Sequence, residues 1–283
     1  MIAVIGAAGR SGAALCRALA EAGRDYIAVV RNAEKWRALG LPGEMRVAAL
    51  EDAPALHAAL AGATRVVSCA HARYAAAIIV AAPLDASFVF MGSTRRFSRW
   101  PDFHGDGVRA GEAALLGSGR QGVILHPTMI YGAQGEDNVQ RLAALVRKLP
   151  IAPLPGGGRA LVQPIHQSDV SRSLFAAVTR DWPETRAIVI AGPEPVAYRD
   201  FLAAVARAAG VRVPPVVSVP GWLLRALAPL TRVLPRLPRI GADEVRRLLE
   251  DKDFDIGPMR AELGVTPIPL TEGLALTFAS RET

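Results

Sequence analysis

Three glycines near the start of the chain have the spacing of a loop that binds phosphate groups. Gly6, Gly9 and Gly12 directly follow a short apolar run, and an Ala/Leu-rich stretch with helical character comes after them. A strand, a glycine turn and a helix in this order are the context in which such a motif binds a dinucleotide. The sequence therefore predicts a pyrophosphate against free N–H groups at the helix N-terminus. The predicted loop residues are Gly6, Ala8, Gly9, Arg10, Ser11 and Gly12.

A basic residue follows the second apolar run, at residues 26–30, where NAD and NADP are usually distinguished. An acidic residue there would bind a ribose 2′-hydroxyl, whereas an arginine favours a 2′-phosphate. Arg31 stands at this position, followed by Asn32. Arg10 could reach the same phosphate from the glycine loop and complete a clamp of charge-assisted bonds. The alternative is two solvated arginines, so NADP is the predicted cofactor and NAD its alternative.

Short apolar runs alternate with helical segments through the first part of the chain. Uniformly apolar strands separated by helices predict a parallel sheet covered on both faces, and right-handed crossovers make it a doubly wound, Rossmann-like α/β fold. The expected strands are 2–5, 26–30, 45–50, 65–69 and 87–91, and the expected helices are 11–22, 33–39, 53–60 and 72–82. We place Ser68, Cys69 and Ala70, around the end of the fourth strand, in the predicted cofactor site.

The pattern loosens after Gly92 and becomes mainly helical, with many prolines and arginines, from Val213 onward. We expect an NAD(P)-binding domain at residues 1–160. Residues 161–192 are expected to add further strand and helix elements to the same domain. Residues 193–283 are expected to form a smaller, mainly helical domain that covers the substrate.

Composition limits the class of protein. The chain has 283 residues, 51% of them hydrophobic, which fits a globular protein with a large core. No stretch has about 18 consecutive uncharged apolar residues, so no membrane span is expected. No basic segment precedes the first apolar run, so no signal peptide is expected. The two cysteines, Cys16 and Cys69, fit a reducing compartment, and we predict a cytoplasmic protein.

The formal net charge is +7, carried almost entirely by arginine. The arginines are scattered and not interleaved with aromatic residues, so nucleic-acid binding is not expected. An anionic ligand or an acidic partner explains the charge equally well. Residues 219–240 combine leucines with arginines, which could contact a membrane surface or a protein partner. Their prolines exclude one long helix, and a lid or a packing role is the preferred interpretation. No metal site is predicted.

Several motifs together resemble those of the extended and atypical short-chain dehydrogenases/reductases. The nearest branch is that of the NAD(P)-binding, epimerase/dehydratase-like proteins, some of which are redox sensors or accessory subunits of respiratory complex I. The similarity covers nearly the whole chain. The motifs are the glycine loop 6–12, Ser93-Thr94, and the segments 127–132, 163–169, 191–194, 263–267 and 272–274.

The resemblance implies roles for residues near the nicotinamide. Ser93 or Thr94 would orient the substrate, and Pro127, Thr128, Met129 and Ile130 would line the nicotinamide. Catalysis in the family uses a tyrosine with a lysine four residues later, and no tyrosine of this chain has a lysine at that spacing. Aligned on the following Gly-Glu pair, His104 stands where the tyrosine should be.

Three interpretations of this gap stay open. His104 could replace the tyrosine as a proton donor, with Arg109 supplying the positive charge. His104 and Arg109 could instead be solvated surface residues. The chemistry could also use His126, or His166 with Asp169.

Three functions therefore follow from the sequence. The chain could be an oxidoreductase or epimerase acting on a small carbonyl or sugar-like substrate through a non-standard proton donor. It could bind the dinucleotide as a redox sensor without catalysis. It could also be an accessory subunit that NADP stabilises.

Overall fold

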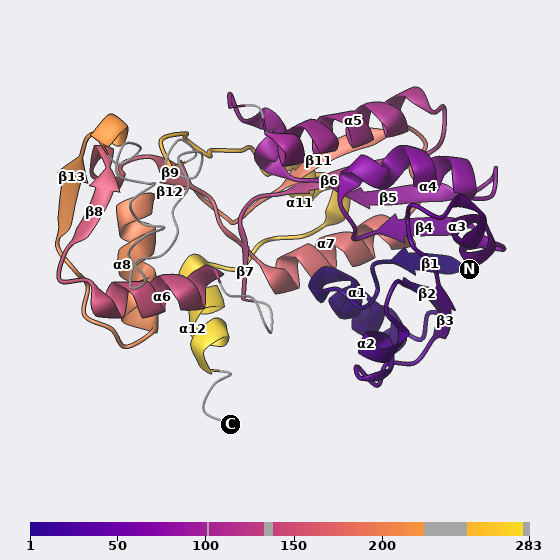
Figure 1. Cartoon of the computed structure of the whole chain (residues 1–283), viewed down its shortest axis with the longest axis horizontal. Coiled ribbons are helices and arrows are strands. Elements are labelled where there is room, and N and C mark those ends of the chain that lie inside the picture. The colour runs from indigo at the N-terminus through magenta and orange to yellow at the C-terminus, as the bar shows by residue number, and fades with distance from the viewer. Residues whose placement is uncertain (101, 133–137, 224–247, 280–283) are drawn as a thin grey trace.

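A parallel sheet of seven strands organises the larger part of the molecule (Figure 1). The computed structural model describes all residues except 101, 133–137, 224–247 and 280–283. The strand order is β11-β6-β5-β4-β1-β2-β3, so the predicted doubly wound α/β fold is confirmed. The strands are β1 (Ile2–Ile5), β2 (Tyr26–Val30), β3 (Glu44–Val47), β4 (Arg65–Ser68), β5 (Ser87–Met91), β6 (Gly122–Pro127) and β11 (Arg186–Ile190).

Helices cover both faces of this sheet because side chains alternate along each strand. In β1, Val4 packs into one buried cluster, while Ala3 and Ile5 pack into the cluster on the opposite face. One face is covered by α1 (Arg10–Glu21), α7 (Gln167–Thr179) and α11 (Gly257–Leu263). The other is covered by α3 (Ala53–Leu60), α4 (Ala75–Ala81) and α5 (Phe103–Gly117), as Figure 1 shows.

The order in which strands are added to the sheet changes direction between the adjacent, parallel strands β1 and β4. From β1 it proceeds to β2 and β3 on one side, and from β4 to β5, β6 and β11 on the other. The carboxyl ends of strands at such a switch point open onto a crevice that binds ligands. Three short elements follow strands at this edge: α2 (Ala33–Arg37), the 3-10 helix η1 (Ala72–Tyr74) and the 3-10 helix η2 (Thr94–Phe97).

A second group of elements packs around its own apolar clusters, at the far end of the molecule from β3 (Figure 1). The helices are α6 (Asn138–Lys148), α8 (Tyr198–Ala208) and α12 (Leu270–Ala279). The short strands and one 3-10 helix are β7 (Ile130–Tyr131), β8 (Ala152–Pro155), η3 (Gly156–Gly158), β9 (Leu161–Val162), β10 (Ile165–His166), β12 (Val196–Ala197) and β13 (Val216–Val219). Because α6 and β8 share apolar contacts with α8, elements from before residue 160 join this group. The boundaries at 160 and 193 stay a prediction.

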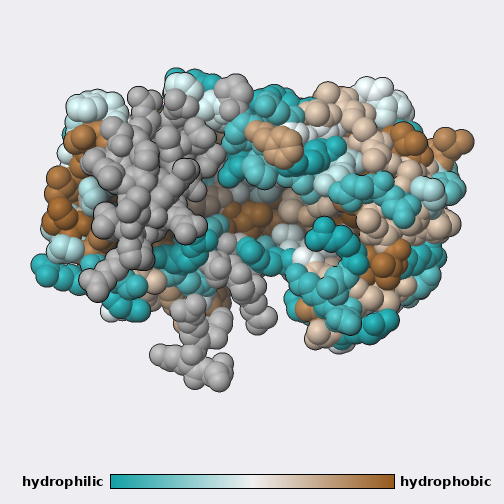
Figure 2. Space-filling view, in the orientation of Figure 1, coloured by the Kyte–Doolittle hydropathy of each residue, from teal (hydrophilic) through white to brown (hydrophobic). Residues whose placement is uncertain are grey.

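Within the described part of the chain, no helix combines the length and the apolar character needed to cross a membrane. On the face shown in Figure 2, hydrophilic and apolar residues are interspersed over the sheet domain. Most of the segment predicted at 219–240 lies outside the described residues.

Candidate dinucleotide site

The glycine loop between β1 and α1 depends on glycine for its geometry. Gly6 has φ +75°, a conformation that side chains rarely adopt. A Cβ at Gly12 would lie 2.2 Å from the Gly6 carbonyl oxygen, and one at Gly9 would lie 3.1 Å from the same atom. The Gly9 N–H donates to that oxygen at 2.8 Å. The loop therefore turns tightly and brings α1 close to β1, as the spacing of the glycines predicts.

The N-terminus of α1 differs from those of the neighbouring helices. Gly9 provides no side-chain cap, and the first turn of α1 contains no acidic residue. In contrast, the side chains of Asn32, Asp52 and Asp102 cap α2, α3 and α5. The first N–H groups of a helix carry partial positive charge and bind anions well. The start of α1 therefore fits a phosphate group.

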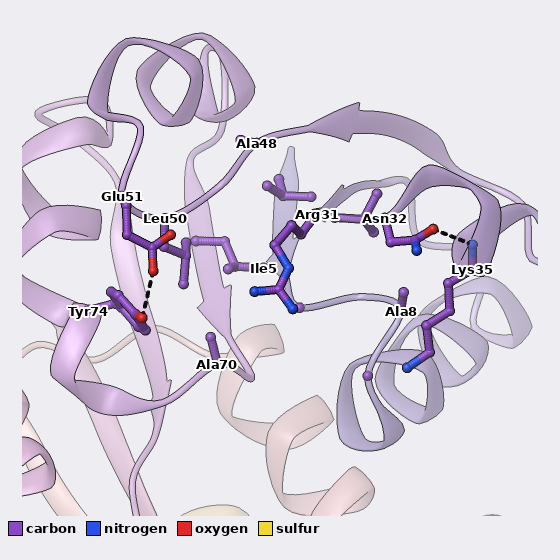
Figure 3. A pocket seen from close by; sticks show the side chains of 14 residues that line it. Ile5, Ala8, Arg31, Asn32, Lys35, Ala48, Leu50, Glu51, Ala70 and Tyr74 are labelled. Atoms are coloured by element: carbon purple, nitrogen blue, oxygen red, sulfur yellow. Dashed lines mark hydrogen bonds between the residues drawn. The ribbon is translucent and has the colours of Figure 1, made fainter. Parts of the chain in front are cut away.

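A pocket opens beside this loop, at the carboxyl ends of β1, β2 and β4 (Figure 3). Arg31 and Lys35 contribute two cations from the β2–α2 side, and the Arg31 guanidinium points into the pocket. The Asn32 side chain accepts the Lys35 backbone N–H at 2.8 Å and so fixes the start of α2. The lining residues include Lys35, which the sequence analysis missed although it lies one helical turn after Arg31. That Arg10 joins Arg31 in binding a 2′-phosphate stays a prediction.

The opposite wall of the pocket comes from residues that the sequence analysis also missed. The Tyr74 hydroxyl donates to Glu51 Oε1 at 2.7 Å, and both residues line the pocket together with Leu50 and Ala70 (Figure 3). This hydrogen bond lowers the pKa of Glu51 and raises the pKa of Tyr74. A signal for Glu51 existed, because it directly follows the third expected strand.

The other predicted cofactor residues lie around the same loop but have different surroundings. Ser11 Oγ donates to Gln167 Oε1 at 3.3 Å, which links α1 to α7. The Cys69 N–H donates to the Ile5 carbonyl oxygen at 3.0 Å, and Ser68 is buried. The end of β4 is therefore packed against the glycine loop, with Ala70 as its contribution to the pocket wall.

The structure brings the predicted substrate-orienting residues next to the predicted nicotinamide segment. Thr94 Oγ1 donates to the Pro127 carbonyl oxygen at 3.3 Å, and Ser93 Oγ accepts the Arg95 N–H at 3.2 Å. Beyond Pro127, Thr128 is buried and donates through Oγ1 to the Gln163 carbonyl oxygen at 2.5 Å. The backbone of Met129 and Ile130 continues into the β7–β10 pair.

His126 is buried between the ends of β5 and β6. Its Nδ1 accepts the Ser93 N–H at 3.2 Å, and its Nε2 lies 2.9 Å from Glu112 Oε2. The same carboxylate oxygen lies 2.5 Å from Arg96 Nε. Burial, together with the nearby Arg96 guanidinium, lowers the pKa of His126 to about 4. His126 is thus a neutral, buried residue that positions Ser93.

This buried histidine is expected to make stability depend on pH. The pKa of His126 falls from its ordinary 6.5 to about 4 in the folded state, so between these values only the unfolded chain takes up the proton. The free energy of unfolding should therefore fall by up to about 3 kcal/mol as the pH falls through this window. Urea denaturation of the wild type and of His126→Gln at several pH values measures this term.

Glu112 changes the pH dependence of stability in the opposite direction, so the wild type has to be compared with His126→Gln. Burial raises the pKa of Glu112, so its contribution to stability grows as the pH falls. The difference in slope between the wild type and His126→Gln isolates the histidine. Equal slopes in the two proteins would show that His126 is not held neutral.

His104, the predicted replacement for the tyrosine, has different surroundings from His126. His104 is exposed in the first turn of α5. Arg109 is bound to Asp106 and to the Arg96 carbonyl oxygen, and the guanidinium beside His104 is that of Arg73.

The predicted pair of His166 and Asp169 lies away from the pocket. His166 Nδ1 accepts the Ser168 N–H at the start of α7. Asp169 is fully buried, pairs with Arg172 and accepts the Ile268 N–H at 3.0 Å. Both residues therefore fasten the start of α7 in the fold.

Comparison with known proteins gives results at two levels. A family model described as NAD(P)H-binding matches residues 6–92. No curated protein sequence matches the chain. Several solved structures share the fold over nearly the full length of both chains.

Two of these structures are reductases. The NADPH-dependent quinone oxidoreductase from Escherichia coli, complexed with NADPH, has a TM-score of 0.77 and 18% identity, and the match covers 98% of this chain and 100% of that one. The triphenylmethane reductase from Citrobacter sp., complexed with NADP(H), has a TM-score of 0.77 and 17% identity, with the same coverage of 98% and 100%.

A third is an epimerase. The UDP-glucose 4-epimerase from Thermotoga maritima, with UDP-glucose, has a TM-score of 0.72 and 16% identity, and the match covers 98% of this chain and 97% of that one. The chain therefore has the fold of these NAD(P)-dependent reductases and epimerases, and its residues 6–92 match an NAD(P)H-binding family model. The resemblance to extended and atypical short-chain dehydrogenases/reductases is thus confirmed for the fold and for the NAD(P)H-binding segment at residues 6–92.

Proposed function

We propose that this protein is an NADP(H)-dependent reductase of small carbonyl or quinone-like acceptors. The observation that carries the proposal is the pocket beside the glycine loop, into which Arg31 points and which Lys35 also lines. Two cations at this edge suit the 2′-phosphate that distinguishes NADP from NAD. Two of the structural neighbours are reductases with this cofactor bound, which supports the same assignment.

The residues near Ser93 favour reduction over epimerisation. An epimerase must first remove a proton from a substrate hydroxyl. In this family that is the task of a tyrosine with a lysine four residues later, and no tyrosine of this chain has a lysine at that spacing. When bound, NADPH supplies a hydride. In a reduction the hydride goes to the acceptor, and the acceptor oxygen takes a proton from solvent, so the protein needs mainly to orient the two molecules. We assign that orientation to Ser93 and Thr94, which lie beside Pro127.

The test is NADPH oxidation in the presence of a panel of quinones and aldehydes. We expect turnover with NADPH and a preference over NADH of about tenfold or more in kcat/KM, because each charge-assisted contact with the phosphate contributes about 1.5–3 kcal/mol. Reversible NADPH binding without turnover on any acceptor would overturn the reductase and support the redox-sensor or accessory-subunit alternative. Tighter binding of one redox form would identify the sensor.

Besides NADPH, the proposed reductase requires only a small-molecule acceptor as its partner.

We also propose a cytoplasmic location, supported by Cys16 and Cys69, which are both free thiols in the structure. Burial raises the pKa of Cys69 to about 12 and also raises that of Cys16, so both thiols stay protonated.

A further inference from the structure

Four basic side chains gather at the carboxyl ends of β4 and β5, beside the cofactor pocket. This basic cluster consists of His71 and Arg73 from the η1 turn, Arg95 from η2, and His104 from the start of α5. The rings of His71 and His104 are 5.4 Å apart between centroids. Arg73 Nη2 lies 3.4 Å from His104 Nδ1.

The start of α5 is packed directly against both loops, which fixes the basic cluster. A Cβ at Gly105 would lie 3.0 Å from the Arg95 carbonyl oxygen, and one at Gly107 would lie 3.0 Å from His71 Cε1. Arg73 Nε donates to His71 Nδ1 at 3.2 Å, and the Arg73 guanidinium carbon lies 4.0 Å from the centre of the Phe103 ring. The guanidinium is thus held in one orientation before any ligand arrives.

Positive charge in the basic cluster exceeds the negative charge placed against it. Burial lowers the pKa of His71, and Arg73, His104 and Arg95 lower it further, while Asp102 opposes them. Asp102 Oδ2 lies 3.7 Å from Arg95 Nη1, and Asp102 Oδ1 accepts the Gly105 N–H at 2.6 Å. Among the described groups that act on His71, one carboxylate therefore opposes three cations or potential cations. An anion bound here would relieve their mutual repulsion.

The position of the basic cluster connects it to the proposed reaction. Residues 70 and 74, on either side of His71 and Arg73, line the cofactor pocket. Arg95 directly follows Thr94, and its N–H is bound by Ser93 Oγ. If Ser93 and Thr94 orient one end of an acceptor, its other end could therefore contact the basic cluster.

We propose that the basic cluster binds a carboxylate on the acceptor, so that the preferred substrates are carbonyl compounds carrying an acidic group. A guanidinium with fixed orientation suits a planar carboxylate, with which it forms two parallel bonds. The exposed His104 gives this anion access from solvent. This inference rests on the proposed reductase, because it assigns the substrate class of the same site.

The test compares para-formylbenzoate with its methyl ester, which keeps the aldehyde and the ring and removes the charge. Both are titrated calorimetrically into the protein saturated with NADP⁺, where no turnover occurs. We expect the carboxylate to bind about tenfold more tightly than the ester, since a hydrogen bond to a charged group contributes about 1.5 kcal/mol or more. Arg73→Met and His104→Gln should each reduce this preference, and higher salt should weaken it.

Arg99→Met is the matched control. It removes the same charge from an exposed side chain nearby that is not part of the basic cluster, and the preference should be retained. With NADPH as the reductant, the variants of the basic cluster should raise KM for the acid much more than they lower kcat. If Arg73→Met does not fold, His104→Gln decides the question, because His104 is exposed.

Two results would overturn the inference. Equal affinity for acid and ester in the wild type would show that the basic cluster does not bind the carboxylate. A parallel loss of NADPH affinity in Arg73→Met would assign the basic cluster to the phosphates of the cofactor. Failure of the wild type to bind NADPH would instead refute the proposed function. The acid–ester comparison on the protein without nucleotide then still decides whether the basic cluster binds carboxylates.

Discussion

Replacing Arg31 with aspartate is expected to weaken NADPH binding by about 100-fold and to leave NADH binding within about threefold of the wild type. The Arg31 side chain points into the pocket beside the glycine loop. Arg31→Asp removes a charge-assisted contact with the 2′-phosphate and adds a like charge that repels it. NADH has only a ribose 2′-hydroxyl at this position, and this hydroxyl can donate a hydrogen bond to the introduced carboxylate. Dissociation constants from NADPH and NADH fluorescence titrations measure both effects.

Two further variants separate the local effect from general electrostatics. Lys35→Met should weaken NADPH by about tenfold, since Lys35 lines the same pocket. Arg37→Met removes a positive charge from the same short helix, but Arg37 does not line the pocket, so both affinities should stay close to the wild type. Equal losses of NADPH and NADH in Arg31→Asp would assign Arg31 to a part of the cofactor that both forms share.

The strands β1, β2, β4 and β5 could be predicted because they are largely buried and read as short apolar runs, whereas the edge strand β3 is largely exposed. The first two expected strands coincide with β1 and β2. The two-residue strand β7 could not be predicted, because it exists only through a partner more than 30 residues away. The expected helix at 72–82 is divided in the structure into η1 and α4. Local periodicity does not resolve such a change of helix type.

The geometry of the glycine loop could be predicted because its residues follow one another along a single β-turn-α unit. The basic cluster could not, because it requires η1 to pack on α5, which begins about 30 residues later. That packing depends on Gly111, whose Cβ would lie 2.1 Å from the Ala72 carbonyl oxygen. Glycines inside a helix indicate the close approach of another segment, and Gly105, Gly107 and Gly111 were the available signal.

Gly12→Ala is expected to lower the free energy of unfolding by about 3 kcal/mol, through overpacking where α1 meets β1. The added Cβ would lie 2.2 Å from the Gly6 carbonyl oxygen and 2.9 Å from the Ala7 Cα, and both are backbone atoms that cannot rotate away. The glycine loop must shift, so NADPH affinity should fall with stability. Urea denaturation and a fluorescence titration of NADPH give the two readouts.

Two other glycines distinguish steric strain from loss of the phosphate site. Gly117→Ala, in α5, adds a methyl group with no neighbour within 4 Å, and should stabilise the protein by up to about 1 kcal/mol through helix propensity. Gly9→Ala meets the Gly6 oxygen at 3.1 Å, so its cost to stability should lie between those of the other two. Its methyl group nevertheless stands where a pyrophosphate would approach α1, and NADPH affinity should fall by about tenfold. Unchanged NADPH affinity in a folded Gly9→Ala protein would mean that the phosphates bind elsewhere, because no ligand could approach this turn closely without meeting the added carbon.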